Sequence, residues 1–121
     1  MSESMDTGDK GEEIAAAMLV KKGYKILHRN WQYIHKELDI VAAKDNMVVF
    51  VEVKTRKSPD FDTPSEAVTR KKQRFIVEAA NAYISKYDIQ YESRFDIVSV
   101  IFYEKSYRIE HIQDAFYPSV R

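Results

Sequence analysis

Residues 37–54 read ELDIVAAKDNMVVFVEVK and are the most informative stretch of the chain. The stretch holds two apolar runs separated by a polar pair, and each run has the pattern of a central strand that is covered on both faces. Asp39, Glu52 and Lys54 interrupt this pattern. Because a desolvated carboxylate is unfavourable unless it is paired or bound to a metal, these charges require specific partners.

The polar pair between the runs sets their register. Asp-Asn at residues 45–46 tolerates positive φ and predicts a two-residue hairpin loop. Opposed residues then have numbers that sum to 91, so Asp39 faces Glu52 and Glu37 faces Lys54. Opposed residues share a face with Cβ atoms roughly 4.5 to 5.5 Å apart, so we expect these four charges on one face. A slip of one residue would separate the two acids across the sheet.

This set of side chains suits metal-dependent phosphodiester hydrolysis. Two carboxylates can bind Mg²⁺ or Mn²⁺, which take their remaining ligands from water and a substrate phosphate. Lys54 could orient or deprotonate the attacking water, or stabilise the charge on the phosphate. The alternative is an ion pair of Lys54 with Glu37 or Glu52, with Asp39 held by backbone donors. The residues alone leave both interpretations open.

The spacing from Asp39 to Glu52-Val53-Lys54 resembles the PD-(D/E)xK signature of restriction-endonuclease-like nucleases, although Leu38 stands where the signature has proline. More widely, the chain resembles the YraN family of small bacterial proteins, which is itself similar to archaeal Holliday-junction resolvases. The segments that carry the resemblance follow in the family's order: Gly11-Glu12, Gly23-Tyr24, Glu37-Leu38-Asp39, Phe50 to Arg56, Glu66 to Thr69, Lys72-Gln73 and Arg94-Phe95-Asp96. They cover the chain from about residue 8.

The resemblance implies an α/β fold, a restriction-endonuclease-like three-layer sandwich with a mixed β-sheet flanked by helices. It also implies that Asp39 and Glu52 bind Mg²⁺ or Mn²⁺, that Lys54 is the catalytic lysine, and that Glu12 is a helix-borne catalytic acid. Spacing gives Glu12 a second interpretation, because it stands three residues after Asp9 and suits a capping box.

The function implied by the resemblance is hydrolysis of phosphodiester bonds in DNA, including branched or processed intermediates. The alternative is a non-catalytic nucleic-acid-binding or accessory protein that keeps the nuclease fold. Two departures favour the alternative: Lys36 and Asp62 stand where the family usually has glycine.

The charge pattern supports nucleic-acid binding only locally. Nineteen basic residues balance nineteen acidic ones, which excludes a globally basic surface. Residues 54–74, however, hold seven basic and three acidic residues, a net charge of +4. The candidate phosphate contacts are Arg56, Arg70, Lys71, Lys72 and Gln73. A solvated helix face is the commoner meaning of such a cluster.

Composition restricts the class of protein further. The chain has no cysteine, which excludes disulfides and thiolate metal sites and fits a reducing cytoplasm. No apolar run reaches membrane-spanning length, and the acidic start lacks the features of a signal peptide. The length of 121 residues suits one domain over residues 9–121, after a flexible tail over residues 1–8. We therefore expect a cytoplasmic protein, with a homodimer left open.

Apolar periodicity and turn residues predict the remaining elements. We expect a helix from its cap Asp9 to about Lys22, a strand over 24–34, the two hairpin strands, a polar loop bracketed by Pro59 and Pro64, a helix from its cap Ser65 to about Lys86, and strands over 94–102 and 107–112. The second helix should bury Phe75, Ile76, Ala79, Ala80, Tyr83 and Ile84. Asp96 is interpreted as a structural carboxylate at a strand edge.

Overall fold

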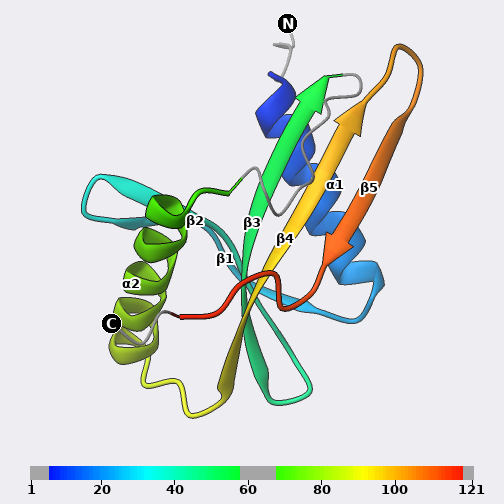
Figure 1. The fold of residues 1–121 in the computed structure, drawn as a ribbon. Coiled ribbons are helices and arrows are strands. Elements are labelled where there is room, and N and C mark those ends of the chain that lie inside the picture. The colour runs from blue at the N-terminus through cyan, green and yellow to red at the C-terminus, as the bar shows by residue number, and fades with distance from the viewer. Residues whose placement is uncertain (1–5, 58–67, 119–121) are drawn as a thin grey trace, which may run out of the picture.

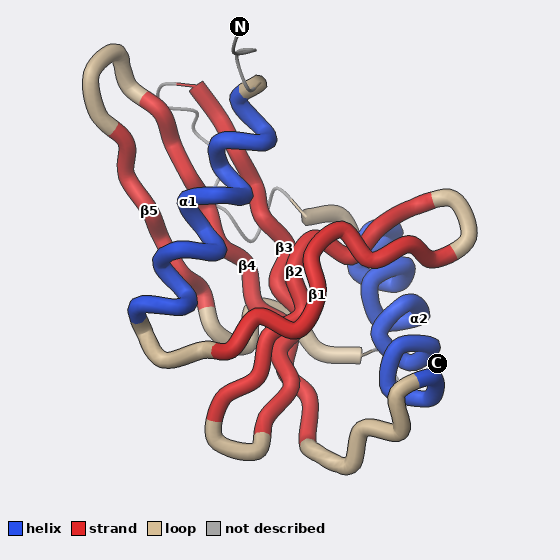
Figure 2. Tube along the Cα trace, turned by 180° about the vertical axis from the view of Figure 1, so that it is seen from behind, coloured by secondary structure: helices blue, strands red, loops and turns tan. Residues whose placement is uncertain are grey.

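The computed structural model describes residues 6–57 and 68–118 as a five-stranded sheet with one helix on each face (Figure 1). The elements are α1 Thr7–Lys21, β1 Lys25–Tyr33, β2 Lys36–Lys44, β3 Met47–Lys57, α2 Arg70–Lys86, β4 Glu92–Phe102 and β5 Tyr107–Ile112. Seen from behind, α1 lies in front of the sheet and α2 lies beyond it (Figure 2). The predicted α/β architecture, with three layers, is confirmed.

The sheet is mixed, as predicted, and its strands lie in the order β1-β2-β3-β4-β5. β1, β2 and β3 form an antiparallel meander, and β5 is antiparallel to β4. β3 and β4 are parallel, which requires the long crossover that contains α2. The parallel pair forms the centre of the molecule, where both faces are covered.

The turn between β2 and β3 has the predicted geometry. Asp45 and Asn46 have φ of 53° and 61°, the conformation of a type I′ turn. The paired residues run from Lys44 opposite Met47 to Ile40 opposite Val51, and their numbers sum to 91 throughout. The predicted register is therefore confirmed, and it follows from two residues whose side chains tolerate the left-handed region.

β3 alternates between two hydrophobic cores. Val48 and Phe50 are buried in the cluster on the α2 side, whereas Val49 and Val51 are buried in the cluster on the α1 side. Full burial of one such side chain stabilises the fold by about 1.5 to 3 kcal/mol. The apolar runs of the sequence thus reflect a strand that is covered on both faces.

The start of α1 differs from the prediction. The helix begins at Thr7, and its N-cap is Asp6, whose carboxylate accepts a hydrogen bond of 2.8 Å from the Asp9 amide. The prediction of Asp9 as the cap was wrong, and residues 7 and 8 belong to the helix rather than to a tail. Both aspartates are good caps in isolation, so the cap is selected by how far the helix packs along the sheet.

The start of α2 also differs. Thr69 is its N-cap and accepts from the Lys72 amide at 3.1 Å, so the helix begins at Arg70. The predicted cap Ser65 and the loop bracketed by Pro59 and Pro64 lie outside the described residues. The predicted inward face is confirmed: Ile76, Ala79, Ala80 and Tyr83 are buried, and Phe75 and Ile84 pack against them. Within the described residues, neither helix is long and apolar enough to cross a membrane.

Candidate active site

Asp39 and Glu52 meet on the α2 face of the sheet, as the turn predicts. The regular pairing of β2 with β3 ends at Ile40 and Val51, one position before the two acids. The Asp39 carboxyl interacts directly with that of Glu52, and its Oδ2 also accepts a hydrogen bond of 2.8 Å from the Val53 amide. The predicted placement of both acids on one face of adjacent antiparallel strands is confirmed.

The environment of this pair disfavours two negative charges. Burial, together with the neighbouring Glu52, raises the pKa of Asp39 to about 7 against the opposing effects of the Val53 amide and Lys72. Burial also raises the pKa of Glu52, and Lys72 opposes that rise. Burial therefore disfavours the ionisation of both carboxyl groups together.

Among the described residues, Lys72 forms an ion pair with the acidic pair. Its Nζ lies 3.4 Å from Glu52 Oε2, and the Glu52 side chain is only 11 % exposed. Lys72 belongs to the first turn of α2, so this ion pair joins the start of the helix to the middle of β3. The sequence placed Lys72 among phosphate contacts, and only the packing of α2 on the sheet brings it to the acids.

Lys54 lies on the same face of β3 as Glu52, two residues further along, and is half-buried. It is close enough to Glu52 for its charge to lower the pKa of that carboxyl. Lys54 is thus placed beside the acidic pair, as the sequence predicts.

Glu37 does not join this group. It pairs with Gln32 of β1, and its Oε2 accepts a hydrogen bond of 2.6 Å from Gln32 Nε2. The regular β2–β3 pairing ends at Ile40 and Val51, so the described ladder does not extend to Glu37 and Lys54, and within the described residues no hydrogen bond or ion pair links the two side chains. The physical reason lies at Asp39, whose carboxylate takes the Val53 amide hydrogen and ends the regular ladder between the strands.

Glu12 lies on α1, and the preceding residue, Gly11, lets this helix approach β3 closely. Gly11 is buried against β3, where an added Cβ would overlap the Thr55 side chain. The glycine allows the helix to approach the strand closely. Burial raises the pKa of Glu12, and the charge of Asp39 raises it further. Because the helix is capped by Asp6, the capping-box interpretation of Glu12 was wrong.

Two residues around Glu12 were missed by the sequence analysis. Asn30 Nδ2 donates to Glu12 Oε1 at 3.0 Å, and Arg29 Nη2 lies 3.9 Å from the same oxygen. Asn30 has φ of 52° and stands opposite Asp39, between two regular pairs of β1 with β2. The irregular backbone at residue 30 could have been predicted from the asparagine within the expected strand, because asparagine tolerates the left-handed region.

The predicted phosphate contacts point in several directions. Arg56 is half-buried on β3, on the same face as Glu52. Arg70 and Gln73 line a hollow of about 430 Å³ beside the C-terminal segment, and Gln73 Nε2 also donates to Val68 O at 2.9 Å. Lys71 lines a second hollow, of about 650 Å³. The first turns of α2 therefore present cations both to the acidic pair and to the surface around it.

The donor set at Asp39 and Glu52 fits a hard divalent cation. Within residues 6–57 and 68–118, no group of three or more histidine, aspartate, glutamate or cysteine side chains is arranged to hold a metal. A zinc site would require such a closed set of ligands. Mg²⁺ and Mn²⁺ need only one or two carboxylates when water and a phosphate supply the rest.

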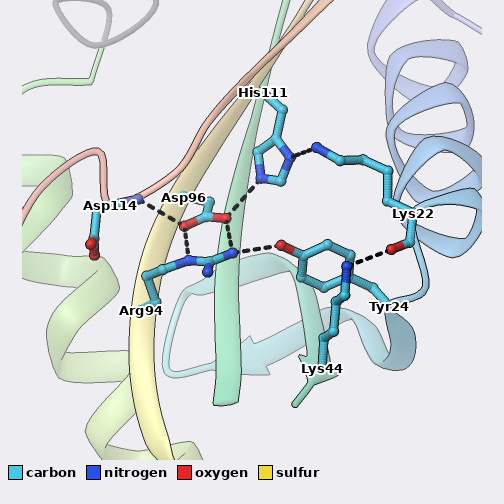
Figure 3. A network of polar contacts seen from close by, with 7 residues as sticks. All are labelled: Lys22, Tyr24, Lys44, Arg94, Asp96, His111 and Asp114. Atoms are coloured by element: carbon cyan, nitrogen blue, oxygen red, sulfur yellow. Dashed lines mark hydrogen bonds and ion pairs between the residues drawn. The ribbon is translucent and has the colours of Figure 1, made fainter. Parts of the chain in front are cut away.

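Asp96 has a different role, which Figure 3 shows. Arg94 donates to both of its oxygens at 2.8 Å, His111 Nε2 lies 2.7 Å from Oδ2, and the Asp114 amide donates to Oδ1 at 3.1 Å. Burial would raise the pKa of Asp96, but the hydrogen bonds from His111 and Arg94 hold it below its usual range. The structural role agrees with the prediction, whereas the edge position was wrong: β4 is an inner strand and Asp96 is fully buried.

The Asp96 network continues to the end of α1. Arg94 Nη2 also donates to the Tyr24 hydroxyl at 2.6 Å, and Lys22 Nζ lies 2.7 Å from His111 Nδ1. Lys44 Nζ donates to the Lys22 carbonyl at 2.7 Å. The network thus ties the end of α1 to β2, β4 and β5 (Figure 3).

Comparison with known proteins gives one consistent family. The model of the uncharacterised protein family UPF0102 matches residues 11–100, which contain Glu12, Asp39, Glu52 and Lys54. A UPF0102 protein of Phocaeicola vulgatus is 47 % identical over 120 residues, covering 99 % of both chains. A UPF0102 protein of Bacteroides thetaiotaomicron is 49 % identical over 118 residues, covering 98 % of both. The chain therefore belongs to the UPF0102 family, to which the YraN resemblance pointed.

Proposed function

We propose that this protein is a nuclease that hydrolyses phosphodiester bonds in DNA with Mg²⁺ or Mn²⁺ bound between Asp39 and Glu52. The observation that carries the proposal is the contact between these two carboxyl groups, which are largely buried and have Lys72 as their ion-pair partner. A divalent cation would allow both groups to be ionised. Its remaining ligand positions would go to water and to a substrate phosphate.

The cation would act as a Lewis acid and lower the pKa of a bound water. Lys54 lies on the same strand face and would orient the attacking water or stabilise the charge on the phosphate oxygens. Glu12 Oε1 is held by Asn30, which leaves Oε2 to orient the water or take its proton. In the reaction, the water oxygen bonds to phosphorus, the bond to the leaving sugar oxygen breaks, and that oxygen takes a proton from solvent.

The proposed substrate is DNA, including branched or processed intermediates, and the proposed place is the bacterial cytoplasm. Support for DNA comes from the basic start of α2 beside the acidic pair and from the similarity of the YraN family to junction resolvases. Because the chain has no net charge, contacts with phosphates must be local. Cutting two strands of a junction would need two sites, so a homodimer belongs to this proposal.

A cleavage assay tests the proposal. The wild-type protein is incubated with Mg²⁺ or Mn²⁺ and with linear, flapped and four-way DNA, and with RNA as a further substrate. Glu52→Ala should reduce cleavage by about 100-fold or more, because it removes a ligand of the cation. Glu110→Ala is the matched control, since this exposed glutamate lies on β5 away from the site. Wild-type protein that cuts none of these substrates would contradict the proposal.

A non-catalytic nucleic-acid-binding or accessory protein is the second candidate. It is favoured by the partners that the acids already have: Lys72 for Glu52 and the Val53 amide for Asp39. In that case the acidic pair would only hold α2 against the sheet. DNA binding that is unchanged by EDTA, together with no heat on titration with Mn²⁺, would favour this candidate over the nuclease.

A further inference from the structure

A hollow of about 430 Å³ lies between the start of α2 and the C-terminal segment. Its described lining consists of Arg70, Gln73, Arg74, Ala115, Phe116 and Tyr117. The three α2 residues are spaced i, i+3 and i+4, so they share one face of the helix. This lining holds two arginines and no carboxylate. The hollow therefore combines positive charge with aromatic surface.

The aromatic side of the hollow is fixed in place. The Ala115 amide donates to the Phe95 carbonyl at 2.8 Å, and Phe116 stacks on Phe95 with ring centres 5.3 Å apart. Figure 1 shows the C-terminal segment, in red, running from β5 across to α2. Tyr117 follows these anchors and is 71 % exposed. Its ring is thus presented to solvent from an anchored backbone.

The electrostatics of the hollow favour a phosphate group. Arg70 and Arg74 lie in the first two turns of α2, at the end where the helix dipole is positive. Arginine binds phosphate through two parallel hydrogen bonds. A cationic groove combined with a stacking aromatic ring is the arrangement by which proteins bind single-stranded nucleic acid.

The hollow adjoins the acidic pair. Lys72 lies between Arg70 and Arg74 in the sequence, yet its side chain turns to Glu52 rather than into the hollow. Both sites therefore involve side chains from the first two turns of α2. A strand bound in the hollow would run beside the end of α2 that also contacts Glu52 through Lys72.

We propose that this hollow binds one unpaired nucleotide, with its phosphate on Arg70 and Arg74 and its base stacked on Tyr117. The inference rests on the proposed nuclease function and narrows its substrate to nucleic acid with an unpaired nucleotide beside the bond that is cut, such as a flap, an overhang or a single strand. A blunt duplex offers no free base face, because extruding a base requires unstacking and unpairing it.

Binding without cleavage tests the proposal. A fluorescent single-stranded DNA and a blunt duplex of the same length are titrated with the protein in EDTA, and affinity is followed by anisotropy. Wild type should bind the single strand at least tenfold more tightly. Tyr117→Ala should weaken single-strand binding by about fivefold to a hundredfold, the range for loss of one stacking contact, and leave duplex binding unchanged. Because Tyr117 is exposed, the variant should fold normally.

Two matched variants separate stacking from other effects. Tyr117→Phe keeps the ring and should bind the single strand within twofold of wild type. Tyr91→Ala removes another exposed tyrosine, 52 % accessible, and should also match wild type. Equal weakening of single-strand and duplex binding by Tyr117→Ala, no weakening at all, or a wild type without preference for the single strand would overturn the proposal.

The nuclease proposal is tested separately with the same proteins. Cleavage in Mn²⁺ depends on Asp39 and Glu52, whereas the stacking contact is measured in EDTA. Failure of cleavage alone would overturn the nuclease. Failure of the Tyr117 effect alone would overturn the nucleotide site and leave the nuclease intact.

Discussion

Two buried acidic centres in this protein differ in how well their charge is compensated. Asp96 accepts hydrogen bonds from Arg94 and from the Asp114 amide and contacts His111, so its lone pairs are occupied. Asp39 and Glu52 contact each other and share one backbone amide and one lysine at 3.4 Å. Asp96 is thus a fully hydrogen-bonded carboxylate, whereas the described residues give the Asp39–Glu52 pair fewer partners for two carboxyl groups.

The pKa values follow this difference in opposite directions. The pKa of Asp96 is lowered, so its ionisation stabilises the fold, whereas burial and Glu52 raise the pKa of Asp39 to about 7, so its ionisation destabilises the fold. Charges that destabilise a fold are characteristic of functional sites, although structural ion-pair networks also shift pKa values. The comparison therefore assigns a structural role to Asp96 and supports the proposed catalytic role of Asp39 and Glu52.

The largest effect on folding stability is expected at Asp96. Asp96→Asn should destabilise the protein by about 3 to 5 kcal/mol, because Arg94 would remain half-buried without its counter-charge. Urea unfolding measures this change. Asp114→Asn is the control, since Asp114 contributes its backbone amide to the network, and its effect should stay below about 0.5 kcal/mol. A loss for Asp96→Asn as small as that of the control would remove the distinction between the two centres.

The next effect concerns chemistry rather than folding. Lys54→Ala should slow cleavage by about 100-fold or more, corresponding to ~2.7 to 4 kcal/mol on the barrier, with folding and Mn²⁺ binding retained. Lys105→Ala, in the turn before β5, is the control. If Lys54 served only to compensate Glu52, the variant would instead show a lower Tm and unchanged cleavage.

A smaller effect on folding stability, of opposite sign, is expected at the Asp39–Glu52 pair. Asp39→Asn should stabilise the protein by about 1 to 2 kcal/mol at pH 8, because it removes one of two crowded charges. The same variant should bind Mn²⁺ more weakly by titration calorimetry. Equal Mn²⁺ affinity in both proteins would reject Asp39 as a ligand.

The pH dependence of folding stability should also differ between Asp39 and Asp96. Asp39 has a folded pKa of about 7 against an ordinary value of 3.8, so the folded state binds the extra proton and wild-type stability should rise as pH falls from about 7 towards 4. Asp39→Asn should lack this rise. Asp96 has a lowered pKa, so its contribution is present above its ordinary value of 3.8 and is lost as pH falls through its folded pKa. Thermal unfolding across pH 3 to 8 measures both.

The smallest effect is expected at the surface around the pair. Arg70→Ala with Lys71→Ala should flatten the salt dependence of duplex DNA affinity by up to about 1.8 in slope, at ~0.9 per lost phosphate contact. Lys72 is retained in this variant because it compensates Glu52. Folding stability should change by less than about 0.5 kcal/mol per residue. An unchanged slope would place the nucleic-acid surface elsewhere.

The parts of the site that sequence predicts are those fixed by short-range chemistry. The left-handed preference of Asp45 and Asn46 sets the register, and the register places Asp39 beside Glu52 and Lys54. The regular ladder ends at Ile40 and Val51, where the Asp39 carboxylate accepts the Val53 amide hydrogen, and Glu37 instead interacts with Gln32. Helix ends were predicted less well, because neighbouring cap residues are nearly equivalent until packing selects one.

The sequence by itself determined the family, the mixed α/β architecture and the meeting of the two acids, because turn chemistry and strand alternation act over a few residues. Only the tertiary structure decided which charges compensate them. Lys72 reaches Glu52 across the α2–sheet interface, Asn30 reaches Glu12, and His111 reaches Asp96 from another strand. Contacts between residues far apart in the sequence depend on how the helices pack on the sheet. The sequence alone does not specify which of several similar cations or amides will contact a given carboxylate.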